Sequence, residues 1–402
     1  MELVVQKYGG SLLTSVSKFA DLAEHIRRCH NKKQKIIAVV SAMKGETDRL
    51  YSLAYELNPS PPKREVDMLI TTGERIAMSL LSIALDKLGI SSISLTGSQS
   101  GILTDKIHGN ARIIKVLGDR IRDCINKVDV VIVAGFQGMN LETKEITTLG
   151  RGGTDLTAVA IAHTLKATKC EFYKDVDGIY TADPKTVPNA KVISKLSWDT
   201  LTALTWNGAS VLHARGAHLA HKFSIPLEIR SGSLLEKKGT IVDSMSNIES
   251  SFVSAITHKN NLCLLQLAFR SKEPTKKIAS FFWDRGETPI IFQQVQGKSG
   301  DTTVNILGSK RNTDDYLQSV TSLASGLRPD ILHHVHNLAA ITVVGEGFWQ
   351  APELVNEIVD IVHDDVVLFE SKNTALVFAL PSPQLSPTIQ RLHEKIFEKS
   401  PS

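Results

Sequence analysis

The chain has 402 residues, of which 42% are hydrophobic, so it is long enough to build two or three domains with cores of their own. Its 46 basic and 42 acidic residues leave a net charge of only +4, which argues against nucleic-acid binding as its main role. The longest apolar runs, such as 36–40 and 128–136, have strand length and are too short to cross a bilayer.

Four widely spaced cysteines without a C-x-x-C pair predict free thiols in a reducing compartment, with neither a disulfide framework nor a zinc site. The first apolar strand begins within three residues of the N-terminus, which leaves no room for a leader sequence. We therefore expect a cytoplasmic protein with no membrane partner.

The first half of the chain alternates short apolar strands with helices, which predicts a largely parallel sheet covered on both faces. The predicted strands are Leu3–Gln6, Ile36–Ser41, Ser92–Thr96, Val128–Ala134, Ile225–Arg230 and Gly239–Val242. The predicted helices are one around Phe19–Ile26, one from about Glu65 to Leu88, Arg112–Asn126 and Leu156–Leu165.

Four residues mark the ends of apolar strands in this half of the chain: Lys7, Ser41, Gly135 and Asp175. The carboxyl ends of parallel strands meet at one edge of the sheet, and ligands collect there. The pattern therefore predicts that these residues lie along the active edge.

The segment 147–158, T-T-L-G-R-G-G-T-D-L-T-A, is the most informative stretch of the chain. Gly152 and Gly153 beside Arg151 let the backbone approach an anion, and Thr154 and Asp155 open a predicted helix. A helix N-terminus attracts a carboxylate or a phosphate. The same residues would also fit an ordinary strand–turn–helix connection.

Two further segments point to phosphate and nucleotide chemistry. Lys7-Tyr8-Gly9-Gly10-Ser11 places an ammonium group and bare amides at a turn, as a phosphoryl group requires. The segment 174–184, K-D-V-D-G-I-Y-T-A-D-P, offers carboxylates for Mg²⁺ or nucleotide hydroxyls and a Tyr ring for a base. Alone, either would also fit a common turn or a polar surface loop.

Together, the ordered motifs from Lys7 to His213 resemble those of the aspartate kinases of the amino-acid kinase superfamily. The matching stretches are K-Y-G-G-S at 7–11, V-V-S-A-M at 39–43, T-D at 47–48, T-T-G-E at 71–74, G-F-Q-G at 135–138, L-G-R-G-G-T-D at 149–155, D-V-D-G-I-Y-T-A-D-P at 175–184 and G-A-S-V-L-H at 208–213.

The resemblance implies a three-layer αβα amino-acid kinase fold over residues 1–242, with a mainly parallel central sheet. It implies transfer of a phosphoryl group from ATP, with Mg²⁺, to the side-chain carboxylate of L-aspartate. The product would be 4-phospho-L-aspartate, on the route to lysine, threonine and methionine.

The resemblance also implies roles for individual residues. Lys7 would contact the transferring phosphate, Asp155 would orient the cationic groups, Glu74 would bind the substrate ammonium and Arg151 a substrate carboxylate. The other substrate contacts would be Ser41, Thr47, Gly152, Gly153 and Thr154. The nucleotide contacts would be Lys7, Tyr8, Gly9, Gly10, Lys174, Asp175, Tyr180, Lys185, Ser210 and Val211. No metal site made of protein side chains is expected.

Two departures from the family pattern change a charge. Ser210 stands where the family carries a second active-site lysine, and Lys174 stands where a Thr is common. One hypothesis is that Lys174 takes over part of the work of the missing cation. The alternative is a solvated surface lysine in a slower enzyme.

A Ser- and Asn-rich stretch, 243–251, is predicted to be a linker to two βαββ units, 252–325 and 326–402. The elements expected in the first unit are strands 252–269, 289–294 and 302–307 with helix 275–284. Those expected in the second are strands 339–344, 366–370 and 375–380 with helix 351–362. The units resemble paired ACT regulatory domains that join a homodimer, but a plain α+β dimerisation module would fit equally well.

Other functions remain open from the sequence. A relative that phosphorylates another amino-acid carboxylate, such as that of glutamate, would also need Glu74 and Arg151. A non-catalytic regulatory paralogue would explain Ser210 and the loose C-terminal repeats.

Overall fold

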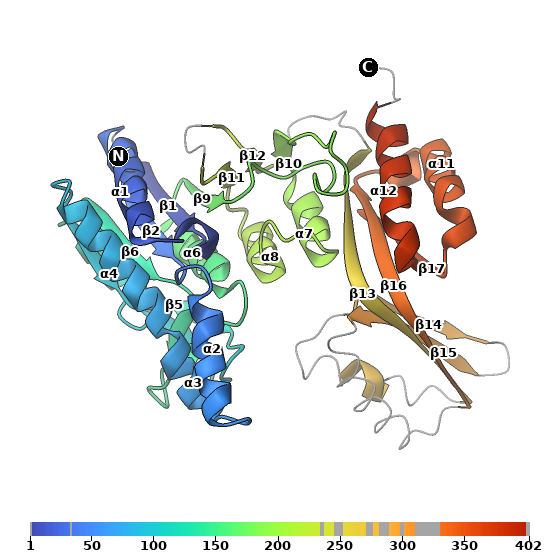
Figure 1. Cartoon of the computed structure of the whole chain (residues 1–402), viewed down its shortest axis with the longest axis horizontal. Coiled ribbons are helices and arrows are strands. Elements are labelled where there is room, and N and C mark those ends of the chain that lie inside the picture. Colours follow the sequence, from blue (N-terminus) through green and yellow to red (C-terminus); the bar gives the residue numbers. More distant parts are fainter. Residues whose placement is uncertain are drawn as a thin grey trace. The chain divides into compact units, whose positions relative to one another are not determined.

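The computed structural model describes residues 2–32, 34–233, 237–244, 252–270, 276–280, 289–297, 301–309 and 330–398. The chain packs into two compact units (Figure 1). The first unit comprises Met1–Ile179, Val192–Thr205 and Ser210–Ile248, and the second Tyr180–Lys191, Trp206–Ala209 and Glu249–Ser402.

The first unit is built on an eight-stranded sheet in the order β10-β12-β11-β9-β1-β2-β6-β3. Its strands are β1 (Glu2–Tyr8), β2 (Gln34–Val40), β3 (Ser92–Leu95), β6 (Val130–Ala134), β9 (Lys169–Lys174), β10 (Lys195–Leu196), β11 (Leu227–Ser231) and β12 (Thr240–Val242). Neighbouring strands are parallel except β11 and β12, which are antiparallel. The prediction of a mainly parallel central sheet is confirmed.

Helices cover both faces of this sheet because its strands are apolar on both sides. Ile36, Ala38 and Val40 of β2 pack in one core with α1 (Val16–Asn31) and α4 (Thr72–Asp86). The alternate residues Ile37 and Val39 are fully buried as well. Helix α6 (Gly153–Leu165) packs on β1, β2 and β9, and α8 (Ala214–Lys222) packs on α6. The result is the expected three-layer arrangement.

A smaller sheet in the same unit has the order β5-β4-β7-β8. Its strands are β4 (Ile102–Thr104), β5 (Ile113–Val116), β7 (Gln137–Asn140) and β8 (Ile146–Thr148); the other helices are α2 (Glu46–Leu57), α3 (Lys63–Ile70), α5 (Asp119–Ile125) and α7 (Trp198–Trp206). The predicted helix Arg112–Asn126 is therefore wrong in its first half. Ile113 and Val116 are β-branched and pair with β4, and Gly118, at φ 76°, starts α5 only afterwards.

The predicted helix from Glu65 to Leu88 is present as α3 and α4, which meet at Thr71. By length and composition this stretch, Lys63–Asp86, is apolar enough to cross a membrane. In the structure it is a core helix of the first unit, because α4 packs on α1, β2, β3 and β6.

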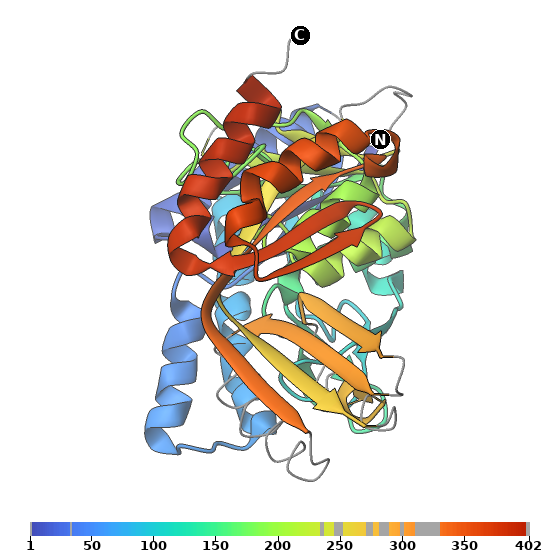
Figure 2. The same ribbon diagram turned by 90° about the vertical axis from the view of Figure 1, so that its right-hand side faces the viewer.

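The second unit contains a six-stranded sheet in the order β14-β15-β13-β16-β18-β17, with antiparallel pairs throughout. Its strands are β13 (Val253–Phe269), β14 (Ile291–Gln296), β15 (Thr302–Ser309), β16 (Ile331–Gly345), β17 (Leu368–Lys372) and β18 (Ala375–Pro381). Two long strands, β13 and β16, lie side by side in the middle of this sheet (Figures 1 and 2). Helices α11 (Pro352–Val362) and α12 (Leu385–His393) share a core with β13, β16 and β18.

The described strands of the second unit agree with the predicted ones, except that β16 begins earlier. Residues 276–280 of the predicted helix 275–284 are helical, and the rest of that helix lies outside the described residues, as does most of the predicted linker.

The segment 180–191 belongs to the second unit although it continues the D-V-D-G-I sequence of the first. Ala182 and Val187 lie in one core with Phe348 and Leu392. The Thr181 hydroxyl lies 2.9 Å from Nε2 of His393, and both residues are buried.

Candidate active site

The ends of four strands of the first unit, β1, β2, β6 and β9, lie at one edge of the sheet, because the hydrogen bonds between the strands continue past the last residues of β1, β2 and β6. The amide of Ser41 donates to the carbonyl of Tyr8 at 3.2 Å, and that of Gly135 donates to the carbonyl of Val40 at 3.0 Å. Gly9 follows β1 and donates to Tyr173 of β9 at 3.4 Å. These strand ends therefore form one continuous edge of the sheet, and its role as the active edge stays a prediction.

The N-terminus of α6 lies at this edge. Gly150 and Gly152 have φ values of 78° and 72°, which let the chain turn sharply from β8 into the helix. A side chain at Gly135 would approach Thr154 to 2.4 Å, so glycine allows the end of β6 to touch the first turn of α6. Residues 153–162 of this helix are buried.

Asp155, in the first turn of α6, holds two lysines from two adjacent strands. Nζ of Lys7 lies 2.8 Å from Oδ1 of Asp155, and the two side chains are 6% and 5% exposed. Nζ of Lys174 lies 3.3 Å from Oδ2 and 3.4 Å from Oδ1. The amide of His213 donates to Oδ2 at 3.1 Å, which orients the carboxylate.

The ionisation of this cluster follows from burial and from its own charges. Burial opposes the charge of Asp155, but Lys174 and Lys7 outweigh this effect and hold the pKa of Asp155 well below its usual range. Burial also lowers the pKa of Lys7 to about 8, with a further contribution from Lys174, although Asp155 acts in the opposite direction. Additional negative charge would be stabilised beside these ammonium groups.

Glu74 forms a second polar centre close to the end of β2. Its Oε1 accepts a 3.1 Å hydrogen bond from the amide of Ala42, and the residue is 3% exposed. Its Oε2 is buried and has no hydrogen-bond partner among the described residues. Burial raises the pKa of Glu74 to about 8. A buried acceptor without a donor is costly, so this oxygen is suited to receive a cationic group from a ligand.

The remaining predicted substrate residues are more open. Arg151 has an 85% exposed side chain whose Nη2 lies 3.5 Å from Oδ1 of Asp48. Ser41 and Thr47 are half-buried. The structure thus places Arg151 in contact with Asp48, next to Thr47 in the chain, at the start of α2.

The predicted nucleotide contacts divide between the two units. Lys7, Gly9, Gly10, Lys174, Asp175, Ser210 and Val211 belong to the first unit, and Tyr180 and Lys185 to the second. The ring of Tyr8 is fully buried and stacks on Tyr173, so only the main chain of Tyr8 is available to a ligand. Gly10 starts a short 3-10 helix, Gly10–Leu12, and a side chain there would come within 2.6 Å of the carbonyl of Ala42.

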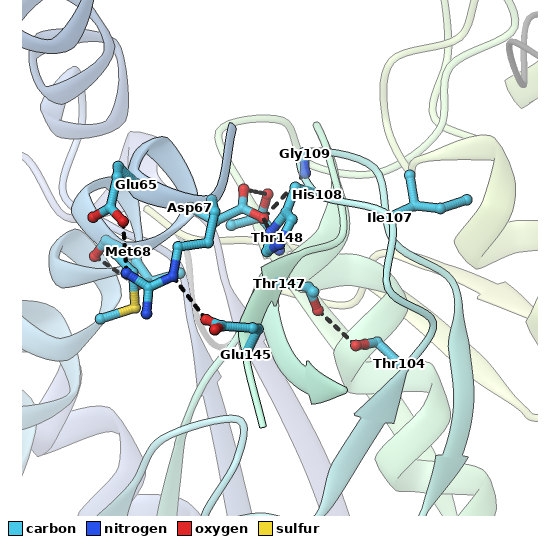
Figure 3. A network of polar contacts seen from close by, with 12 residues as sticks. Glu65, Asp67, Met68, Thr104, Ile107, His108, Gly109, Glu145, Thr147 and Thr148 are labelled. Carbon is cyan, nitrogen blue, oxygen red and sulfur yellow. Dashed lines mark hydrogen bonds and ion pairs between the residues drawn. The ribbon is translucent and has the colours of Figure 1, made fainter. Parts of the chain in front are cut away.

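Sequence reasoning assigned no role to Asp67, which organises the loop beside β8. This fully buried carboxylate accepts hydrogen bonds from Thr148 Oγ1 at 2.6 Å, Thr148 N at 3.2 Å and Gly109 N at 3.1 Å, and lies 2.7 Å from Nδ1 of His108 (Figure 3). The sequence signal for such a buried carboxylate was an aspartate within the apolar run 66–70, V-D-M-L-I. The contacts tie α3 to the start of the 147–158 motif, through Thr148, and to the loop 108–109.

A second network of polar contacts, also not predicted from the sequence, lies on the opposite face of the sheet from Lys7. Glu171 accepts hydrogen bonds of 2.9 Å from Gln6 and from the hydroxyl of Tyr173, and Lys169 lies 2.6 Å from its other oxygen. These residues connect β1 with β9 on the face opposite to Lys7, which fixes the relative position of the two strands that carry Lys7 and Lys174.

Known proteins resemble this chain over nearly its full length. Residues 2–231 match the amino acid kinase family. An aspartokinase of Corynebacterium glutamicum is 35% identical over 405 aligned residues, covering 98% of this chain and 96% of the relative. An aspartokinase of Geobacillus stearothermophilus is 34% identical over 401 residues, covering 98% and 97% of the two chains.

The solved structures agree in fold. E. coli aspartokinase III, in complex with aspartate and ADP, superposes with a TM-score of 0.83 at 19% identity, covering 99% of this chain and all of the other. The match to the family and the identity to the two relatives show the family of this chain, and the superposition shows its fold. The chain belongs to the aspartokinases, within the amino acid kinase family.

Proposed function

We propose that this protein transfers the γ-phosphoryl group of ATP to the side-chain carboxylate of L-aspartate, giving ADP and 4-phospho-L-aspartate. The observation that carries the proposal is the pair of ammonium groups, of Lys7 and Lys174, held on Asp155 at the N-terminus of α6. Phosphoryl transfer depends on positioning and on charge neutralisation more than on covalent chemistry.

Lys7 is the group that would stabilise the transferring phosphate. A carboxylate oxygen of aspartate attacks the γ-phosphorus, the bond to the β-phosphate oxygen breaks, and ADP leaves. The Lys7 ammonium would neutralise the equatorial oxygens, with the amides of Gly9 and Gly10 as further donors. Asp155 would hold the ammonium in place without touching the substrate.

Two charged residues would orient aspartate by its α-substituents. The free Oε2 of Glu74 would accept the α-ammonium group, and this contact would keep Glu74 ionised. Arg151 would turn from Asp48 to bind the α-carboxylate through its two-pronged guanidinium. Ser41, Thr47 and the turn formed by Gly152, Gly153 and Thr154 would line the rest of the pocket.

Mg²⁺ would enter as the counterion of ATP. No group of three His, Cys, Asp or Glu side chains among the described residues is placed to hold a metal ion. Both oxygens of Asp155 are already engaged by lysines. This donor set fits an ion that keeps its waters and is bound mainly by phosphate oxygens, where it would neutralise phosphate charge.

The C-terminal unit would be a pair of ACT-like units that joins two subunits and carries any allosteric control, in a cytoplasmic enzyme. An antiparallel sheet with two helices on one face, α11 and α12, supports this interpretation. Equilibrium sedimentation of the full chain would test the dimer: we expect a mass twice that of one chain, and the mass of a single chain would contradict it.

The activity is tested by ADP release with aspartate, glutamate or N-acetylglutamate as acceptor, with hydroxylamine added to trap the acyl phosphate as a hydroxamate. We expect ADP and hydroxamate in equal amounts with aspartate and background levels with the other acids. Preference for glutamate would identify a different carboxylate kinase. No acceptor-dependent ADP release, with a folded protein, would identify a non-catalytic paralogue.

A further inference from the structure

Lys174 lies inside the active site instead of on the surface. It is the last residue of β9, and its ammonium group lies within 3.3–3.4 Å of both oxygens of Asp155, with the side chain 14% exposed. The surface-charge interpretation of Lys174 is therefore wrong.

The local geometry explains how this side chain reaches Asp155. Lys7 pairs in register with Phe172, so Lys174 extends from the same face of the sheet, two residues further along. The neighbouring position beyond β1 is Gly9, which has no side chain. A Cβ there would be in van der Waals contact with Nζ of Lys7, at 3.5 Å, so glycine keeps this side of the Lys7 ammonium group free of side-chain atoms.

The charges of this cluster do not balance. Asp155 is the only ion-pair partner of Lys7 and of Lys174 among the described residues, and one carboxylate cannot neutralise two ammonium groups. The N-terminus of α6 adds a partial positive charge at the same place. Such a desolvated excess of positive charge is stabilised by binding an anion.

The loop 208–213 reaches the same carboxylate but brings no cation. Its last residue, His213, binds Asp155 through the backbone amide, and Ser210, three residues earlier, is exposed. A lysine at position 210 would therefore extend from a loop that is anchored on Asp155.

We infer that Lys174 is the second phosphate-binding cation of this enzyme and performs from β9 the function that a lysine at position 210 would perform from the loop. This inference rests on the proposed kinase activity. Lys174 is less buried than Lys7 and its ammonium is divided between two longer contacts, so it can turn to the nucleotide phosphates while Lys7 stays on Asp155.

The first test measures the binding of MgADP and of a non-hydrolysable ATP analogue by calorimetry, without any need for turnover. Lys174→Ser is expected to weaken binding by about 10- to 100-fold, since hydrogen bonds from an ammonium to phosphate are charge-assisted. Lys174→Arg should retain most of the affinity. The matched control is Lys115→Ser, which removes an exposed lysine on β5 and should change nothing.

The second test is a double-mutant cycle with Ser210→Lys. If the two positions serve one function, Lys174→Ser costs much less nucleotide affinity in the Ser210→Lys background than in the parent. In steady-state kinetics the loss should fall on kcat and on the KM of ATP, with the KM of aspartate unchanged.

Unchanged nucleotide affinity in Lys174→Ser would overturn the inference, as would an equal loss in both backgrounds. The proposed function fails by a different result, namely a parent chain that binds MgADP but releases no ADP in response to aspartate. The binding experiments decide the role of Lys174 in either case.

Discussion

Nζ of Lys7 and Oδ1 of Asp155 form a 2.8 Å ion pair that is almost completely shielded from water. The pair joins the end of the first strand of the sheet to the first turn of α6, although 147 residues separate the two positions in the chain. It places an ammonium group of lowered pKa at a helix N-terminus, where the developing charge of a phosphoryl group would be stabilised.

We expect Lys7→Ala to lower kcat by about 100-fold or more, because it removes charge stabilisation that is strongest in the transition state. Asp155 would still be paired with Lys174, so the fold should survive, as circular dichroism would show. Turnover close to that of the parent would contradict the assigned role, and Lys115→Ala is the control.

The pKa of Glu74, raised to about 8, predicts the pH dependence of aspartate use. Only ionised Glu74 pairs with the substrate ammonium, so kcat/KM for aspartate should rise with pH towards about pH 8. Above that pH it should fall again, because Lys7, with a pKa also of about 8, loses the proton that stabilises the transferring phosphate. Glu74→Gln should flatten this rise and lower kcat/KM by about 100-fold, while MgADP binding is retained. An unchanged pH profile in the variant would exclude Glu74 as its source.

Glu74→Gln should also change how the stability of the folded protein depends on pH. The folded state keeps the Glu74 proton up to a pKa of about 8, whereas the unfolded chain releases it near the ordinary glutamate pKa of 4.5. Between these values the folded state binds more protons, so the parent loses stability as the pH rises. Glu74→Gln should therefore gain in Tm relative to the parent from acid to neutral pH.

Arg151→Lys should raise the KM of aspartate at least about tenfold, because an ammonium group cannot reproduce two parallel hydrogen bonds to a carboxylate. The side chain is 85% exposed and contacts only Asp48 at 3.5 Å, so little stability should be lost. Steady-state kinetics with each substrate varied in turn would check this. A change confined to the KM of ATP would mean that the assigned substrate sites are exchanged.

Gly152→Ala and Gly45→Ala form a matched pair, since both glycines have a positive φ, 72° and 79°. A Cβ at position 45 would meet no atom within 4 Å, whereas one at position 152 would lie 2.3 Å from the ring of His213. Both variants should lose about 1 kcal/mol from backbone strain. Gly152→Ala should lose more stability, and also turnover, because moving His213 withdraws its amide from Asp155. Equal losses of stability and activity in the two variants would contradict this account.

We expect weak or absent feedback inhibition by lysine or threonine. ACT effector sites usually use a glycine turn before a helix. The corresponding residues of the first βαββ unit, 270–275, are R-S-K-E-P-T without a glycine, and positions 271–275 lie outside the described residues. In the second βαββ unit Gly347 is followed by Phe348, whose side chain is buried in the core. The measurement is a titration of lysine and threonine, singly and together, at sub-saturating aspartate. Inhibition at effector concentrations below about 1 mM, which corresponds to a binding free energy of about −4 kcal/mol or better, would contradict this prediction.

Much of the first unit was predictable from sequence. Apolar runs such as Ile36–Val40 are short, buried on both faces and separated by helices, and these local patterns specify a parallel sheet and its active edge. The glycines and charges of the motif 147–158 likewise predicted a turn and a helix N-terminus. The local pattern predicted the wrong type of element only at 112–118. The helical periodicity there predicted a helix, but the segment contains β5, which pairs with β4.

Tertiary structure decided the rest, because burial and ionisation depend on residues that are distant in the chain. Nothing local distinguishes Lys174 from a solvated lysine until β9 pairs with β1 and places it beside Asp155. Asp67 becomes a structural anchor only where the 108–109 loop and Thr148 bring donors to it. The motifs by themselves determined the family. The contacts between strands and helix ends decided which charged side chains lie beside one another and so shift each other's ionisation.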